Sequence, residues 1–230
     1  MLLLFEGAGK STLMVALLRI VELSEGSIYI DGENTEKVGL AKLRSNIAVI
    51  PQDPVLYSGT VRTNLDPFDD HDDEKLYEVL RRVGLSGTVT HSSSSLSLSS
   101  LSQSIKSQNQ SSRVESLADE VTEGGSNFSV GQRQLLVIAR ALLNGSKLVI
   151  MDEATAAVDA ETDAAIQKVM REEFSAATVL TVAHRINTIM DSSYILVMSD
   201  GRASEFDTPK KLLEQGGLFR DLVQAAQNKN

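Results

Sequence analysis

The sequence predicts an α/β fold in which a mostly parallel sheet is flanked by helices. Residues 148–151 and 178–183 are apolar along almost their whole length, which is typical of strands covered on both faces in a parallel sheet. Around these runs, apolar residues recur at helical spacing, most clearly over 13–21 and 135–143. Strands and helices that alternate in this way indicate one layered α/β domain.

The composition excludes several classes of protein. The 230 residues suffice for one domain, with or without a subdomain. A net charge of −9 without a basic face argues against a nucleic-acid partner. The chain has no cysteine, so we expect neither a disulfide partner nor thiol chemistry. The opening MLLLFEGAGK has no signal-peptide cleavage site, and no apolar run approaches the roughly 20 residues of a membrane-spanning helix, so we expect no transmembrane segment here.

A candidate phosphate cradle lies near the amino end. Residues 2–5 are a possible strand, and EGAGKST over 6–12 precedes a helical pattern. Glycines let backbone N–H groups approach phosphate oxygens, and a helix N-terminus favours the anion. Lys10 would neutralise phosphate charge and Ser11 would bind Mg²⁺. The full pattern is G-x-x-x-x-G-K-[ST], but Leu4 stands at its first glycine position, and an ordinary glycine-rich helix start is the alternative.

Two further strands are predicted before the middle of the chain. Residues 26–32 alternate between polar and apolar with glycine at each end, and 47–50 form a short apolar run. Pro51 ends the second strand, which puts Gln52 in a loop directly after it. The side-chain amide of Gln52 there can reach a metal ion or a water, although by itself a plain loop residue is the simpler interpretation.

The middle of the chain changes character. From Thr60 the pattern is helical, and the acidic run 69–74 suits a solvated first turn of a helix, with His71 exposed in it. Residues 91–112 are Ser-rich and of low complexity, and they predict a disordered insertion because they cannot bury enough apolar surface.

A second helix start follows the insertion. Ser129 and Gln132 have the spacing of a capping box, an apolar helical face follows, and Asn144 with Gly145 ends it. A well-capped helix is the simple interpretation, and an anion site at its N-terminus is the functional one.

Two carboxylates, Asp152 and Glu153, end the buried run 148–151. Ligands of open α/β sheets bind at the carboxyl ends of strands, where one acid can hold a metal ion and its neighbour can orient or deprotonate a water. His184 follows the strand 178–183 and would share this edge with Asp152 and Gln52.

The carboxy-terminal part predicts three more elements. A helix is expected over 160–174, a hairpin turn at 199–201 and one closing helix over 212–226.

In their order along the chain, these motifs resemble the nucleotide-binding domain of an ATP-binding-cassette transporter, and more narrowly the second such domain of a class C, multidrug-resistance-associated transporter. EGAGKST is similar to the Walker A loop, Gln52 to the Q-loop residue, and FSVGQ over 128–132 to the LSGGQ signature. LVIMDE is similar to Walker B with the catalytic glutamate, AAVD over 156–159 to the D-loop, and TVAHR to the switch-histidine motif.

The resemblance implies a P-loop NTPase core with a helical signature subdomain. The implied domain covers 1–230, with core 1–59 and 137–230, a helical subdomain over 60–136 and the insertion over about 91–112. The implied ligands are ATP and Mg²⁺, with Ser11, Gln52 and Asp152 on the metal. The family's nucleotide-binding positions fall here on Gly7, Gly9, Lys10, Ser11, Thr12, Ser129, Gly131, Gln132 and Asp159. Its catalytic positions fall on Glu153, His184 and Gln52.

The resemblance also implies partners and a location. Two cassettes would close head to tail on ATP, and transmembrane domains of the parent transporter would convert this into transport at the cytoplasmic side of a membrane. The family carries strands and an adenine-stacking aromatic residue before Walker A, so we expect a chain truncated at its amino end.

Two alternatives stay open at this point. A truncated cassette with little or no ATPase activity would act at most as a nucleotide- or partner-binding module. A soluble cassette protein of ribosomes or chromosomes is less consistent with the sequence, since it shows no sustained heptads, one set of motifs and no basic linker.

Overall fold

The computed structural model describes residues 2–4, 9–85, 114–152, 158, 160–183 and 189–227. The predicted Ser-rich insertion at 91–112 lies outside them. The chain divides into two compact units. The first, here called the sheet unit, comprises Met1–Val49, Ser146–Glu153 and Thr178–Asn230. The second, the helical unit, comprises Ile50–Gly145 and Ala154–Ala177.

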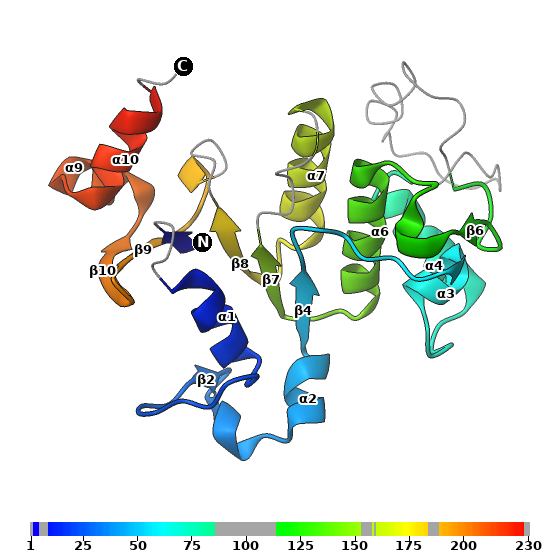
Figure 1. The fold of residues 1–230 in the computed structure, drawn as a ribbon, viewed down its shortest axis with the longest axis horizontal. Coiled ribbons are helices and arrows are strands. Elements are labelled where there is room, and N and C mark those ends of the chain that lie inside the picture. The colour runs from blue at the N-terminus through cyan, green and yellow to red at the C-terminus, as the bar shows by residue number, and fades with distance from the viewer. Residues whose placement is uncertain are drawn as a thin grey trace. The chain divides into compact units, whose positions relative to one another are not determined.

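The sheet unit is built on a six-stranded sheet with the order β10-β9-β1-β8-β7-β4 (Figure 1). Strand β1 is parallel to both β8 and β9, β7 is parallel to β8, and β10 is antiparallel to β9. The predicted mostly parallel sheet is therefore confirmed. The strands are β1 (Leu2–Leu4), β4 (Ile47–Ile50), β7 (Leu148–Asp152), β8 (Thr178–Ala183), β9 (Ile195–Ser199) and β10 (Arg202–Asp207).

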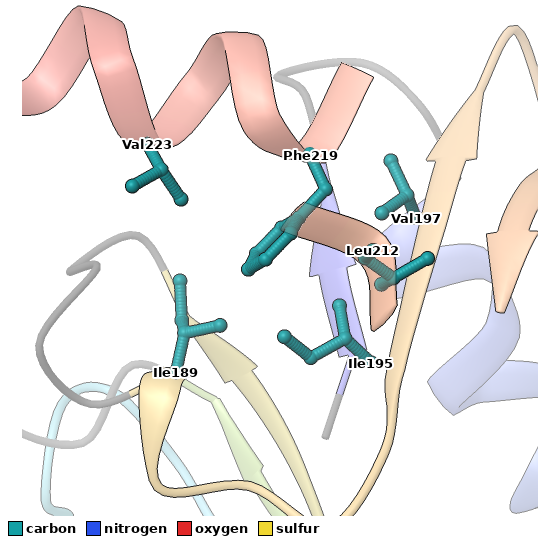
Figure 2. Packing of buried hydrophobic residues seen from close by; sticks show 6 residues of the cluster. All are labelled: Ile189, Ile195, Val197, Leu212, Phe219 and Val223. Carbon is teal, nitrogen blue, oxygen red and sulfur yellow. The ribbon is translucent and has the colours of Figure 1, made fainter. Parts of the chain in front are cut away.

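Strand β9 shows how helices come to cover both faces of this sheet. Its side chains alternate, so Leu196 and Met198 lie on one face, where they pack with Leu13 and Met14 of helix α1 (Lys10–Leu17). Ile195 and Val197 lie on the opposite face and pack with helices α9 (Pro209–Gln215) and α10 (Leu218–Gln227) (Figure 2). The period of two in one apolar strand thus decides which helix covers which face.

The carboxy-terminal end forms two helices, α9 (Pro209–Gln215) and α10 (Leu218–Gln227), so the prediction of a single closing helix was wrong. Gly216 and Gly217 separate them with positive φ angles of 72° and 132°. A Cβ atom on Gly217 would collide with the carboxylate of Glu205. That carboxylate accepts the backbone N–H groups of Leu218 at 2.7 Å and Phe219 at 3.1 Å, so it caps α10 from the neighbouring strand.

Smaller elements complete the sheet unit. The antiparallel pair β2 (Tyr29–Ile30) and β3 (Glu33–Asn34) is shorter than the strand predicted over 26–32. A 3₁₀ turn (Thr35–Lys37) and helix α2 (Leu40–Ser45) follow. The Arg19 guanidinium donates to backbone carbonyls at both ends of that turn and so holds the segment beside α1.

Helix α6 (Val130–Leu143) is the centre of the helical unit. Helices α3 (Val61–Leu65), α4 (Asp73–Arg82) and α7 (Ala160–Glu173) all contact it. The short pair β5 (Gly59–Thr60) and β6 (Glu120–Val121) and a 3₁₀ turn (Glu123–Gly125) lie in the same unit. Arg82 forms an ion pair with Glu173, with Nε to Oε2 at 2.7 Å, which joins α4 to α7.

The loop between α3 and α4 is organised by Asp66, whose side chain is only 4% exposed. One of its carboxylate oxygens accepts the backbone N–H of His71 at 2.7 Å, and His71 Nδ1 lies 3.6 Å from the same oxygen. Burial by itself would raise the pKa of Asp66, but N–H groups of His71 and Asp70 and the charges of His71 and Arg62 lower it below its ordinary value. His71 is half-buried, so the prediction of an exposed His71 was wrong.

The variant Asp66→Asn is expected to lower the free energy of unfolding by about 1.5–3 kcal/mol near neutral pH, because a buried charged acceptor is lost. The depressed pKa means that Asp66 stabilises the fold above its unfolded-state pKa of about 3.9, and that this contribution disappears as the pH falls through the folded-state pKa. Urea unfolding at several pH values measures it: the gap between wild type and variant should stay constant from neutral pH to about pH 5 and shrink below about pH 4. The exposed Asp69→Asn is the matched control, and an equal loss there would contradict the assignment.

Candidate functional site

Helix α1 begins without a side-chain cap. Its N-cap is Gly9, with φ 97° and ψ 17°, which has no side chain to accept a hydrogen bond from the first turn. The first hydrogen bond of the helix runs from the Leu13 N–H to the Gly9 carbonyl at 3.0 Å. The backbone N–H groups of Lys10, Ser11 and Thr12 therefore have no acceptor within the helix. An uncapped helix start of this kind is suited to bind an anion.

This helix start lies at the carboxyl edge of the parallel strands. A Cβ atom on Gly9 would lie 3.5 Å from Met198 Cε and 3.7 Å from Gly201 Cα. Met198 is in register with Leu4, the last residue of β1. Because the carboxyl ends of β1 and β9 coincide, the open turn of α1 faces the edge at which α/β sheets bind ligands.

Asp152 lies at the same edge and on the same face of the sheet. It is the last residue of β7 and is in register with Val182, near the end of β8. Alternation puts Asp152 on the face of Leu148 and Ile150, which pack in a cluster with α1 residues Met14 and Leu17. Asp152 is half-buried. The structure therefore brings the start of α1 and Asp152 together at one edge and one face.

This arrangement suits a phosphate group and a divalent cation together. Mg²⁺ is usually held by one or two carboxylates and by substrate phosphates, which is a smaller protein ligand set than that of zinc or calcium sites. Within the described ranges, no three His, Asp or Glu side chains gather as a metal site. One carboxylate, Asp152, and a phosphate bound at the uncapped start of α1 would be enough for Mg²⁺ by this criterion.

The start of α6 confirms the predicted capping box. Ser129 Oγ accepts the Gln132 N–H at 3.2 Å, and Gln132 Oε1 accepts the Ser129 N–H at 2.8 Å. Gly131 is buried in the first turn, where a Cβ atom would collide with the Thr162 side chain of α7. The close packing of α7 on α6 therefore requires a glycine at this position, independently of its predicted role in nucleotide binding.

Gln52 belongs to the helical unit and is exposed in the loop that follows β4. The residue before it, Pro51, accepts a hydrogen bond from Gln134 of α6, with carbonyl O to Nε2 at 3.4 Å. Gln134 is a buried residue beside this loop that the sequence pattern does not identify. Its signal was a polar residue next to the apolar helical face 135–143, but spacing alone cannot show that such a residue is buried.

The predicted site residues thus fall into three groups. Gly9, Lys10, Ser11, Thr12 and Asp152 lie in the sheet unit, at one edge and on one face of the sheet. Gln52, Ser129, Gly131 and Gln132 lie in the helical unit. Gly7, Glu153, Asp159 and His184 lie outside the residues that the structure describes.

Comparison with known proteins shows what this arrangement is similar to. The family model described as "ABC transporter" matches residues 5–156. "ABC transporter C family member 12" of Dictyostelium discoideum is 50% identical over 218 residues, 94% of this chain. "ATP-binding cassette sub-family C member 3" of Rattus norvegicus is 46% identical over 220 residues, 96% of this chain. A solved bacterial Atm1-family ABC exporter with ATP bound matches 98% of the chain with a TM-score of 0.79 and 30% identity.

The chain spans only a small part of these proteins. It covers 15% and 13% of the two curated relatives and 36% of the exporter chain. Among the residues that the structure describes, every helix is too short or too polar to cross a membrane.

Proposed function

Since the chain belongs to the ABC transporter family, we propose that it is a nucleotide-binding cassette that binds and hydrolyses ATP to drive export by a class C transporter. The observation that carries the proposal is the uncapped start of α1 at the carboxyl edge, on the same face of the sheet as Asp152. The chain carries one set of cassette motifs, and their resemblance to the second cassette of class C transporters is the basis for proposing the carboxy-terminal position.

Each residue near α1 has a chemical role in this proposal. Gly7 and Gly9 let the backbone approach the phosphates, and the N–H groups of Lys10, Ser11 and Thr12 donate to phosphate oxygens. The Lys10 ammonium neutralises charge on the β- and γ-phosphates. A positive φ of 97° at Gly9 supports this role, because a residue with a Cβ atom would be strained there.

Ser11, Asp152 and Gln52 are the proposed ligands of Mg²⁺. When bound, the ion neutralises charge that develops on the phosphoryl group. The hydroxyl, carboxylate and amide oxygens of these residues are the hard donors that this ion prefers.

Glu153 and His184 are the proposed catalytic pair. Glu153 takes the proton of the attacking water as general base, since it directly follows Asp152 at the end of β7. His184 directly follows Ala183, the last residue of β8, and would contact the γ-phosphate where charge shifts during transfer. Gln52 would orient the same water or sense the γ-phosphate.

The signature residues act on a second nucleotide. Ser129, Gly131 and Gln132, with Asp159, would contact ATP held by a second cassette that closes head to tail on this one. Transmembrane domains of the parent transporter would bind the pair at the cytoplasmic side of a membrane. The substitution of SVGQ for the usual signature supports a weaker second composite site.

Binding of MgATP by the purified chain tests the proposal. Lys10→Ala should weaken ATP binding about 10- to 100-fold, because a charge-assisted contact to phosphate is lost. Isothermal titration calorimetry measures it, and Lys42→Ala, an exposed lysine of α2, is the control that should leave affinity unchanged. Equal affinities of the Lys10 and Lys42 variants, or no binding by the wild type, would overturn the proposal.

A further inference from the structure

Helix α6 holds the loop that carries Gln52 at the loop's first residue. Gln134 of α6 is fully buried, and its Nε2 donates to the carbonyl of Pro51 at 3.4 Å. The other polar atom of the side chain, Oε1, is buried and has no hydrogen-bond partner among the residues that the structure describes. A buried unpaired acceptor costs about 1–3 kcal/mol, so a residue serving only to fill this space would be apolar.

The same helix holds the far end of the loop through Asn64. Arg140 Nε donates to the Asn64 carbonyl at 2.7 Å. The Asn64 side chain in turn accepts the N–H of Tyr57 at 2.9 Å and donates to the Tyr57 carbonyl at 2.8 Å. Two points of the loop, Pro51 and Tyr57, are therefore tied to one helix.

Between these two ties, Pro54 and Leu56 are buried and the other residues are exposed. Leu56 is buried, and its Cδ1 lies 2.7 Å from where a Cβ atom on Gly125 would be, so only glycine fits there. Gln52 and Asp53 are exposed. Gln52 thus lies between the buried Pro54, two residues away, and the hydrogen-bonded Pro51, which is its direct neighbour.

We propose that Gln134 is a positioning residue. By holding the Pro51 carbonyl, it sets the position of Gln52 for its proposed contacts with Mg²⁺ and the attacking water. This inference rests on the proposed function, because the role of Gln52 does. Helix α6 starts at the signature residues Ser129 and Gln132, so one rigid element links the contact to the partner's nucleotide with the loop of this cassette's own Gln52. Gln134 does not touch the nucleotide; it acts through the Pro51 carbonyl.

Hydrogen exchange tests the positioning without any nucleotide. Gln134→Met keeps an unbranched side chain of similar length and removes both polar atoms. Amide exchange of residues 52–57, followed by mass spectrometry, should become about 3- to 10-fold faster, as expected for one lost hydrogen bond. The matched control is Gln167→Met on α7, which also removes a 3.4 Å amide donor bond, here to Asp163. It should leave exchange over 52–57 unchanged.

In catalysis, Gln134→Met is expected to change kcat more than the KM for ATP. Gln134→Met should lower kcat about 3- to 10-fold, raise the Mg²⁺ concentration needed for half-maximal rate, and change the KM for ATP less than about twofold. Gln52→Ala should show the same pattern, and the double variant should be no slower than Gln52→Ala, because both act on one contact. If Gln134 had a merely structural role, its substitution would lower thermal stability without lowering kcat selectively.

The outcomes separate the two claims. Unchanged exchange over 52–57 in Gln134→Met, or additive losses of kcat in the double variant, would overturn the positioning role. Absence of ATP hydrolysis in the wild type would instead refute the proposed function, while the exchange experiment would still decide whether Gln134 holds the loop. If Gln134→Met does not fold, Gln134→Asn gives the second test, since it stays polar but is one methylene too short to reach Pro51.

Discussion

Glu153→Gln is expected to abolish nearly all ATP hydrolysis by the chain while leaving ATP affinity close to that of the wild type. General base catalysis by a carboxylate typically contributes about 10²- to 10⁴-fold to a rate, and an amide of the same shape cannot accept the proton of the attacking water. Binding should persist because the phosphate contacts come from the start of α1, not from Glu153. Steady-state phosphate release and calorimetric ATP titration measure the two quantities.

The control for this prediction is Glu214→Gln on α9, an exposed glutamate, which should leave both quantities unchanged. If the wild type and Glu153→Gln hydrolyse ATP at the same low rate, the chain does not turn over ATP by the proposed mechanism. A chain that then still binds ATP would be a nucleotide-binding module without turnover.

Phe219→Ala should lower the free energy of unfolding by about 3–5 kcal/mol, the range for deleting a buried aromatic ring. Phe219 is completely buried and lies among Ile189, Ile195 and Leu212, where α9 and α10 meet the sheet (Figure 2). Removing its ring leaves a cavity that rigid strand residues cannot close. Chemical denaturation followed by circular dichroism measures the loss.

The matched control is Phe206→Ala on β10, in the same unit. Phe206 is 66% exposed and stacks on Tyr194 with ring centroids 5.5 Å apart. Loss of that pair should cost no more than about 1.5 kcal/mol. Comparable losses in the two variants would show that the cluster around Phe219 is not the core of the carboxy-terminal part.

Local rules explain which elements the sequence predicted well. The capping box of Ser129 and Gln132, the helix end at Asn144 and the hairpin turn at Ser199–Asp200–Gly201 depend on neighbours within a few residues, and all three are confirmed. Gly216 and Gly217 are an equally local signal for a helix break, which the prediction of a single helix did not use. There the apolar spacing continues across the break, and the periodicity outweighed the two glycines.

Long-range contacts explain what the sequence could not predict. His71 was expected to be exposed because its neighbours are acidic, but its backbone N–H turns inward to the buried Asp66. In the sequence, Gln134 resembles any polar residue of an amphipathic helix. Its burial depends on contact with Pro51, which lies 83 positions earlier in the chain.

By itself, the sequence determined the α/β class, the family and the identity of the phosphate- and metal-binding candidates, because apolar periodicity and glycine spacing are properties of short segments. Only the tertiary structure decided that Asp152 and the start of α1 share one face of the sheet and that α6 holds the loop of Gln52 at both ends. These features depend on strand register and on helix packing, which join segments far apart in the chain and leave no local pattern.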